Sequence, residues 1–338
     1  MKHCLNTHSA RSMRSSVVIP MLSALALVFA LSFLPGCTNV KRLGFASGGK
    51  TLNAIPYQFK DGKTSSYYTF TVGDNPRPST IVFFYGGSGC ASWKYVMPAY
   101  LDGFTEPARV FVLNKRFVDD RSNGMFGCSK EFHRANNPDQ WEADYSEFVS
   151  AQLSKASPRP KNVVLVGVSE GAYPAEEVAR RLPAVTHLAI IGAGGYSMRT
   201  SLATLAQNGI IPYDVDAGWQ EITSDPQSLD KHWYGNPYRW WYDIMDVDPM
   251  KDLLALNIPI LAGIGEKDKS VPVESARFLE TEFRKAGKRN LFLHVYSGAD
   301  HRLIARGKSY RKEYFGELSR LLQSHPGPTG KAGRKSSR

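Results

Sequence analysis

Short apolar runs rich in β-branched and aromatic residues recur through the middle of the chain, and they predict the strands of a buried sheet. Stretches compatible with helices lie between several of these runs. Because strands that alternate with helices pair in parallel, the pattern predicts an α/β fold with a mostly parallel central sheet flanked by helices. The predicted strands are Tyr67–Val72, Thr80–Tyr85, Arg109–Leu113, Asn162–Val166, His187–Ile191, Pro259–Ile264 and Asn290–Tyr296, and the predicted helices are Asp144–Ala156, Ala172–Arg181, Val273–Ala286 and Leu303–Gln323.

The segment at about 194–251 interrupts this alternation. A structureless connection of that length is rare in a compact domain, so we predict a partly helical cap over the edge of the sheet. Its aromatic side chains either line a pocket for an acyl or aryl group or pack the cap onto the body, and both interpretations stay open. These aromatic residues are Trp219, Trp233, Tyr234, Tyr238, Trp240, Trp241 and Tyr242.

The chain begins with a targeting segment, in which basic residues precede an apolar run from Val17 to Leu34. The run ends in Leu34-Pro35-Gly36-Cys37, which resembles the lipobox of bacterial lipoprotein signal peptides. This resemblance implies cleavage after residue 36 and a lipid on Cys37, with either Met1 or Met13 as the start. An uncleaved anchor is the alternative, because the run is about long enough to span a bilayer. We expect a membrane-held protein of the bacterial cell envelope that faces the periplasm or the exterior.

The rest of the chain divides into a linker at 37–50, one α/β domain at 51–324 and a tail at 325–338. The tail is rich in Pro, Gly, Ser and basic residues, which predicts disorder. The formal net charge is +11, of which three positive charges lie in the targeting segment and four in the tail, so about +4 remains on the domain. That charge is ordinary for the size of the domain and gives no support to nucleic-acid binding.

Cysteine usage fits an oxidising compartment. Cys4 lies in the targeting segment and Cys37 would carry the lipid, which leaves Cys90 and Cys128 as a possible disulfide. Such a bridge closes a loop of about 40 residues and stabilises the fold by about 3 to 4 kcal/mol. Two free thiols are the alternative. Because the sequence contains no closely spaced cysteine pair and no His-Glu-x-x-His motif, we predict no metal site.

The motif Gly167-Val168-Ser169-Glu170-Gly171 lies between a predicted strand and a predicted helix. Glycines two residues to either side of the serine permit the tight strand-to-helix turn of a nucleophile elbow. Ser169 would then lie at the N-terminus of the helix, whose free amides favour a developing negative charge. We predict that Ser169 is a nucleophile activated by a base.

Two later loops follow predicted strands and contain the partners that a serine nucleophile needs. Asp268 follows the run at Pro259–Ile264, and His301 follows the run at Asn290–Tyr296. The elbow and the chain order Ser169, Asp268, His301 resemble the α/β-hydrolase superfamily over about residues 50–324. The resemblance implies that His301 takes the proton from Ser169, while Asp268 fixes the tautomer of the imidazole and stabilises its cation.

Other side chains compete for the roles of acid and base. Asp268 is preferred as the acid because it follows Gly265 by three residues, the usual spacing in the superfamily. His187 and His294 fall on predicted strands, so we interpret both as structural. The competing residues are Glu266 and Asp300 for the acid, and His133 and His232, both in predicted loops, for the base.

The strand at Thr80–Tyr85 leads into Gly86-Gly87-Ser88-Gly89-Cys90, where the superfamily builds half of its oxyanion hole from main-chain N–H groups. The resemblance implies that Gly87 or Ser88 supplies one donor and Glu170 the other. Many relatives carry His before the glycines, whereas this chain has Tyr85. Neither this loop nor Gly192-Ala193-Gly194-Gly195 completes a nucleotide-binding motif, because the first lacks a following Lys-Ser or Lys-Thr pair and the second lacks its third glycine.

These observations favour a serine hydrolase that cleaves small carboxylic esters through an acyl-serine intermediate, without a metal or organic cofactor. A peptidase is the nearest alternative, because the two glycine motifs also resemble features of prolyl peptidases, although no amino-terminal propeller precedes the domain. Thioesterase and acyltransferase activities use the same acyl-enzyme and stay open. A non-catalytic envelope lipoprotein that uses the fold only for binding is the alternative from another class, and the presence of all three triad residue types argues against it.

Overall fold

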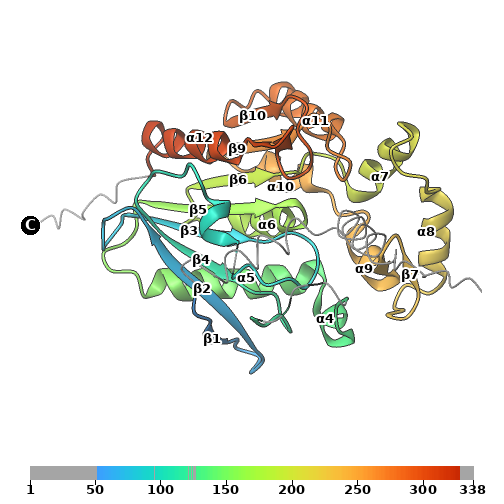
Figure 1. Cartoon of the computed structure of the whole chain (residues 1–338), viewed down its shortest axis with the longest axis horizontal. Helices are drawn as coiled ribbons and strands as arrows, with labels where there is room; N and C mark the ends of the chain where they lie inside the picture. Colours follow the sequence, from blue (N-terminus) through green and yellow to red (C-terminus); the bar gives the residue numbers. More distant parts are fainter. Residues whose placement is uncertain (1–51, 95, 121, 123, 125–126, 328–338) are drawn as a thin grey trace, which may run out of the picture. The chain divides into compact units, whose positions relative to one another are not determined.

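The computed structural model describes residues 52–94, 96–120, 122, 124 and 127–327. The predicted signal peptide, Cys37 and the linker lie outside this part of the chain, as do residues 328–338 of the predicted tail. Within the described residues an eight-stranded sheet has the order β1-β2-β4-β3-β5-β6-β9-β10 (Figure 1). Its strands are β1 (Ile55–Gln58), β2 (Thr64–Val72), β3 (Thr80–Tyr85), β4 (Ala108–Leu113), β5 (Asn162–Val168), β6 (His187–Ile191), β9 (Ile260–Gly265) and β10 (Leu291–Tyr296).

The strand pairing is parallel from β4 through β3, β5, β6 and β9 to β10, whereas β1 and β2 are antiparallel to their neighbours. The helices are α3 (Met97–Tyr100), α4 (Lys130–Ala135), α5 (Pro138–Ser154), α6 (Ala172–Arg181), α7 (Met198–Gln207), α8 (Val215–Ser224), α9 (Tyr238–Ile244), α10 (Pro249–Ala255), α11 (Val273–Lys285) and α12 (Arg311–Ser324). This is the α/β-hydrolase fold, as the sequence predicts.

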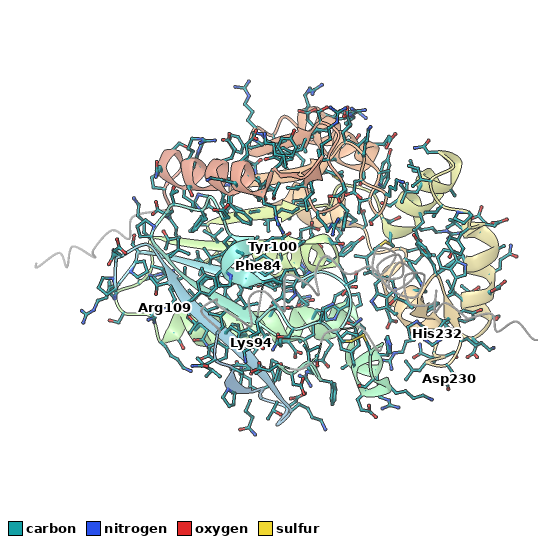
Figure 2. All side chains as sticks on the ribbon, in the orientation of Figure 1. Phe84, Lys94, Tyr100, Arg109, Asp230 and His232 are labelled. Carbon is teal, nitrogen blue, oxygen red and sulfur yellow. A yellow bond between two sulfur atoms is a disulfide. The ribbon has the colours of Figure 1, made fainter. Side chains whose placement is uncertain are left out.

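Side chains alternate between the two faces of the sheet along each strand, and helices cover both faces. In β3, Phe83 and Tyr85 belong to the core shared with α5 and α6. Phe84 belongs to the opposite core, which is shared with α3 and α12, and its ring lies 5.4 Å from that of Tyr100 in an edge-to-face contact (Figure 2). The continuous apolar runs of the sequence therefore correspond to strands covered by helices on two sides.

The predicted cap segment folds into α7, α8, α9, the start of α10 and the short hairpin of β7 (His232–Trp233) and β8 (Asn236–Pro237). It lies beyond the carboxyl ends of β5 and β6 (Figure 1). Trp240 and Trp241 are buried against each other with ring centroids 4.6 Å apart. Lys130 Nζ of α4 lies 2.5 Å from the carboxylate of Asp230. The cap thus has an aromatic core of its own and a solvent-exposed ion pair to α4.

Two predicted helices have the wrong start. The helix predicted from Asp144 begins six residues earlier, at Pro138, where the side chain of Asn137 caps it. The helix predicted from Leu303 begins only at Arg311, because Ile304–Ala305 and Lys308–Ser309 form a hairpin. Positive φ at both turn residues, Arg306 and Gly307, is the geometry of a two-residue hairpin. The strand β1, half-buried at the sheet edge, was not predicted.

The predicted tail is also ordered at its start. The backbone oxygen of His325 accepts a hydrogen bond of 2.7 Å from His187 Nε2, and Gly327 N–H donates to Asn162 Oδ1 at 2.9 Å. These contacts correct the predicted boundary by three residues. Among the described residues, none of the helices combines the length and the apolar character needed to cross a membrane.

Candidate active site

Ser169 lies directly after β5 in a strained backbone conformation, with φ +54°. The sharp turn needs the glycines on both sides. A Cβ on Gly167 would lie 2.6 Å from Ala172 Cα, and one on Gly171 would lie 2.4 Å from the carbonyl oxygen of Tyr85. The motif therefore forms the sharp strand-to-helix turn that the sequence predicts, packed against the end of β3.

Asp268 and His301 are joined by a hydrogen bond of 2.7 Å between Asp268 Oδ2 and His301 Nδ1. The other oxygen of Asp268 accepts hydrogen bonds from the backbone N–H groups of Ser270 and Val271, at 2.8 and 2.9 Å. The Asp268 side chain is fully buried and that of His301 is a quarter exposed. A carboxylate held in this way fixes the orientation of the imidazole and leaves Nε2 free to act as a base.

Backbone hydrogen bonds between two loops bring this pair together. Glu266 N–H donates to the Tyr296 carbonyl at 3.0 Å, and Lys267 N–H donates to the Ala299 carbonyl at 2.9 Å. Because β9 and β10 are parallel neighbours, the loops after them leave the sheet at the same edge. Two residues far apart in the sequence thereby become hydrogen-bonded partners.

The competing acids have partners of their own. Glu266 Oε2 accepts hydrogen bonds from Ser297 Oγ and Gly298 N–H at 2.9 and 2.8 Å. Asp300 forms an ion pair with Arg302 at 3.1 Å. Neither carboxylate has a hydrogen bond to His301 among the described residues, so the geometry favours Asp268 as the acid.

The competing histidines are placed elsewhere. His187 is buried, with Nδ1 2.8 Å from Thr186 Oγ1 and Nε2 bonded to the backbone, as expected of a structural residue. His294 lies on β10, also as predicted. His133 of α4 and His232 of β7 have ring centroids 6.3 Å apart, and burial lowers the pKa of His133. His301 alone of these rings forms a hydrogen bond with a carboxylate in the described part of the chain.

Gly192 makes room for the imidazole of His301. A Cβ at this position would lie 2.7 Å from His301 Cε1, and the backbone has φ +64°. The glycine run that resembles an incomplete dinucleotide turn therefore has a different use. Gly192 and Ser169 both line one pocket, which places the imidazole and the serine at the same end of the sheet. No hydrogen bond joins Ser169 to His301 in the described residues, and contacts of this kind commonly tighten only when substrate binds.

The glycine-rich loop after β3 lies beside the nucleophile. A Cβ on Gly87 would lie 3.4 Å from Ser169 Cβ, whereas Ser88 is exposed. Glu170 follows Ser169 in the first turn before α6. Cys90, at the end of the loop, forms the predicted disulfide with Cys128, with Cα atoms 5.7 Å apart. The glycine-rich loop and the elbow are therefore neighbours at this end of the sheet.

The side chain of Glu170 has a partner that sequence reasoning missed. Glu170 is 2 % exposed and forms an ion pair with Lys115 Nζ, which also lies 4.8 Å from the ring centroid of Trp141. The ammonium offsets a buried negative charge directly beside Ser169. Lys115 follows β4, and the pairing of β4, β3 and β5 brings it to the elbow.

The pocket beside Ser169 lies between α6, the loop after β6, α7 and α11. It contains about 370 Å³ of empty space, including the part open to solvent. None of the seven cap aromatics named above lines this pocket. Tyr238, Trp240 and Trp241 are buried in the cap, whereas Tyr234 and Tyr242 are exposed. The lining residues of the pocket are Ser169, Glu170, Ala172, Tyr173, Glu176, Gly192, Ala193, Gly194, Tyr196, Met198, Ser201, Pro249, Val271 and Ser275.

Most of these pocket residues were not singled out from the sequence. The signal that was available is helical spacing, because Tyr173 and Glu176 follow Ser169 by four and seven residues and so lie on the same face of α6. The residues from α7 and α11 gave no comparable local signal, since only the folded chain brings them next to the elbow. The structure therefore adds a side-chain pocket to the catalytic residues that the sequence suggests.

Comparison with solved structures agrees with this fold. An acylaminoacyl peptidase from Pyrococcus horikoshii is 13% identical with a TM-score of 0.57, and the match covers 85% of this chain but 43% of that one. An esterase from Pyrococcus furiosus is 15% identical with a TM-score of 0.56, covering 82% and 91% of the two chains. The esterase domain of a Rhodothermus marinus protein is 16% identical with a TM-score of 0.52, covering 81% and 98%.

At these identities the likeness is one of fold, and this chain spans less than half of the length of the acylaminoacyl peptidase. No match was found among curated protein sequences. A sequence model of the prolyl oligopeptidase family, however, matches residues 121–323, which contain the elbow, the acid and the histidine loop. With the elbow, the Asp268–His301 pair and the α/β-hydrolase sheet in place, this match shows that the chain is a serine hydrolase that belongs to the prolyl oligopeptidase family.

Proposed function

We propose that this protein hydrolyses small carboxylic esters through an acyl-serine intermediate on Ser169. The observation that carries the proposal is the 2.7 Å hydrogen bond between Asp268 and His301 at the edge of a pocket that begins at Ser169. A buried carboxylate that fixes an imidazole beside a strained serine is the arrangement that activates a hydroxyl for acyl transfer.

In this mechanism His301 Nε2 takes the proton of Ser169 as Oγ attacks the ester carbonyl, and then gives the proton to the leaving alcohol. Asp268 stabilises the imidazolium that forms between these steps. The backbone N–H groups of Gly87 and Glu170 would bind the oxyanion, and losing one such donor costs about 3 to 4 kcal/mol of transition-state stabilisation. Water then attacks the acyl-serine, with His301 again acting as the base.

Hydrolysis of peptide bonds is the second candidate, because the family model that matches this chain is that of prolyl oligopeptidases. The same acyl-serine forms in both reactions, and the leaving group is an amine in place of an alcohol. The family match and the fold support ester and peptide substrates comparably. The two are distinguished by substrates that share one acyl group and differ only in the leaving group.

A fluorophosphonate probe tests for the activated serine. We expect the probe to label the wild-type protein, and to label neither Ser169→Ala nor, at a measurable rate, His301→Ala. A p-nitrophenyl ester and a p-nitroanilide of the same acyl group then separate the two candidates by kcat/KM. A kcat/KM much higher for the anilide than for the ester would favour peptide-bond hydrolysis over ester hydrolysis. Folded wild type that the probe does not label would refute both functions.

A further inference from the structure

The pocket beside Ser169 contains an acid that the proposed mechanism does not use. Glu176 of α6 is 2 % exposed and lines this pocket. Among the described residues, no group donates a hydrogen bond to its carboxyl or forms an ion pair with it. Because a buried carboxyl without a partner costs free energy, a ligand that brings a donor to it gains binding energy.

The position of Glu176 sets the length of such a ligand. Glu176 follows Ser169 by about two helical turns, or about 10 Å along the axis of α6. Side chains on a helix tilt toward its N-terminus, so the Glu176 side chain extends back in the direction of Ser169. A cation on a four-carbon stem, such as the ammonium of lysine, is the group that we expect to reach from an acylated Ser169 to this carboxyl.

The electrostatics of the pocket favour a cation over a neutral donor. The only charged side chains in its described lining are the acids Glu170 and Glu176, and Glu170 already has Lys115 as its partner. Burial and the nearby charge of Asp252 raise the pKa of Glu176 well above its usual range. An entering cation stabilises the ionised form.

The remaining lining suits the stem of such a group. Apart from the two acids it consists of small, apolar and hydroxyl-bearing residues from four elements, among them Ala193, Met198 and Val271. These surfaces exclude water from a hydrocarbon chain and leave its charged end to the carboxylate.

We propose that Glu176 makes this enzyme selective for substrates whose acyl side bears an amine or guanidinium at the end of an apolar stem of about lysine length. The proposal rests on the proposed function, because the stem enters the pocket from the carbonyl carbon that Ser169 attacks. Glu176 is then a specificity-determining residue that touches substrate but takes no part in proton transfer.

The first test compares p-nitrophenyl esters and p-nitroanilides of N-acetyl-lysine and N-acetyl-norleucine, which share a four-carbon stem and differ in the terminal ammonium. We expect wild type to prefer the lysyl substrate in kcat/KM by about tenfold or more. Glu176→Gln should remove this preference, measured within the variant as the ratio of lysyl to norleucyl kcat/KM. Glu177→Gln is the matched control, because Glu177 pairs with Arg180 and Arg181 and does not line the pocket.

The second test measures fluorophosphonate labelling of Ser169 in the presence of the methylamides of the same two amino acids. The proposal is supported if the lysine amide protects wild type more strongly than the norleucine amide does. This difference in protection should disappear in Glu176→Gln. Equal or better use of the norleucine compounds by wild type overturns it, whether or not the variant folds. Folded wild type that is not labelled at all would refute the proposed function, and this inference with it.

Discussion

At the scale of single residues, the site depends on glycines at positions where neighbouring atoms occupy the space that a Cβ would need. Gly171 lies against the carbonyl of Tyr85, and Gly192 lies against the ring of His301. The first could be predicted, because an elbow needs glycine at that offset from the serine. The second could not, because Gly192 and His301 are 109 positions apart and meet only through the pairing of β6, β9 and β10.

A substitution at Gly192 tests this contact. We expect Gly192→Ala to displace the His301 ring and lower kcat by about 100-fold, since displacing a catalytic group by about 1 Å has effects of that order. The control is Gly209→Ala, which has a similar φ of +66° but no atom within 4 Å of a Cβ. If both variants lose activity equally, backbone strain and not the His301 contact is the cause.

At the scale of elements, a disulfide bond links the loop between β3 and α3 to the segment before α4. Cys90 ends the glycine-rich segment, and its disulfide to Cys128 joins that segment to the residue before the N-cap of α4, Ser129. The two cysteines pack with Val118 and Phe132 in a small cluster apart from the main cores. The bridge therefore adds to the apolar contact that Trp93 of the same loop makes with Phe84.

Removal of the bridge should lower stability. We expect Cys90→Ala/Cys128→Ala to reduce the free energy of unfolding by about 3 to 4 kcal/mol, the entropy that a loop of this length gains in the unfolded chain. Urea denaturation measures the change, and dithiothreitol should move wild type to the midpoint of the variant while leaving the variant unaffected. A wild-type midpoint that does not respond to the reductant would contradict the expectation.

His187, at the start of β6, forms a hydrogen bond with the backbone of His325, directly after α12. Burial lowers the pKa of His187 from 6.5 to about 4, so the folded protein holds this ring neutral while the unfolded chain protonates it below pH 6.5. Its contribution to stability is therefore complete above pH 6.5 and is lost as the pH falls toward 4.

We expect the free energy of unfolding to decrease between pH 6.5 and pH 5, with His187 responsible for about 2 kcal/mol of that decrease. Urea denaturation of wild type and His187→Gln at several pH values checks this, because the variant should have the shallower pH dependence. Parallel pH dependences of the two proteins would show that His187 does not control acid stability.

At the scale of the whole molecule, the sequence places the hydrolase domain behind a segment that resembles a lipoprotein signal. We propose that a lipid on Cys37 holds the enzyme on a membrane of the cell envelope, where the Cys90–Cys128 disulfide is stable. A membrane-held hydrolase would act on substrates that reach the envelope from outside the cytoplasm.

The anchor has its own test. Cys37→Ser should lose palmitate labelling and leave the membrane fraction, whereas Cys4→Ser should keep both, because Cys4 lies in the part that is cleaved. Retention of Cys37→Ser in the membrane fraction would favour an uncleaved apolar anchor instead. The kcat/KM of both variants should equal that of wild type, since neither residue belongs to the described domain.

Local patterns in the sequence were sufficient to determine much of this protein. Strand runs such as Thr80–Tyr85 and His187–Ile191 have the predicted bounds, because a strand buried on two faces must be continuously apolar. The elbow was predictable for a similar reason, since its strand, turn and helix are adjacent in the chain. The order of nucleophile, acid and histidine then identified the fold.

Only the tertiary structure decided which distant groups meet. Strand order and loop contacts decide the choice of Asp268 over Glu266, the ion pair of Lys115 with Glu170 and the placement of the buried Glu176 carboxyl in the pocket beside Ser169. No local pattern encodes these contacts. The sequence thus determined the elements and the residue types for acyl transfer, because these follow from periodicity and turn chemistry. The folded chain decided the partners and the pocket, because side chains far apart in sequence acquire neighbours only when the sheet is assembled.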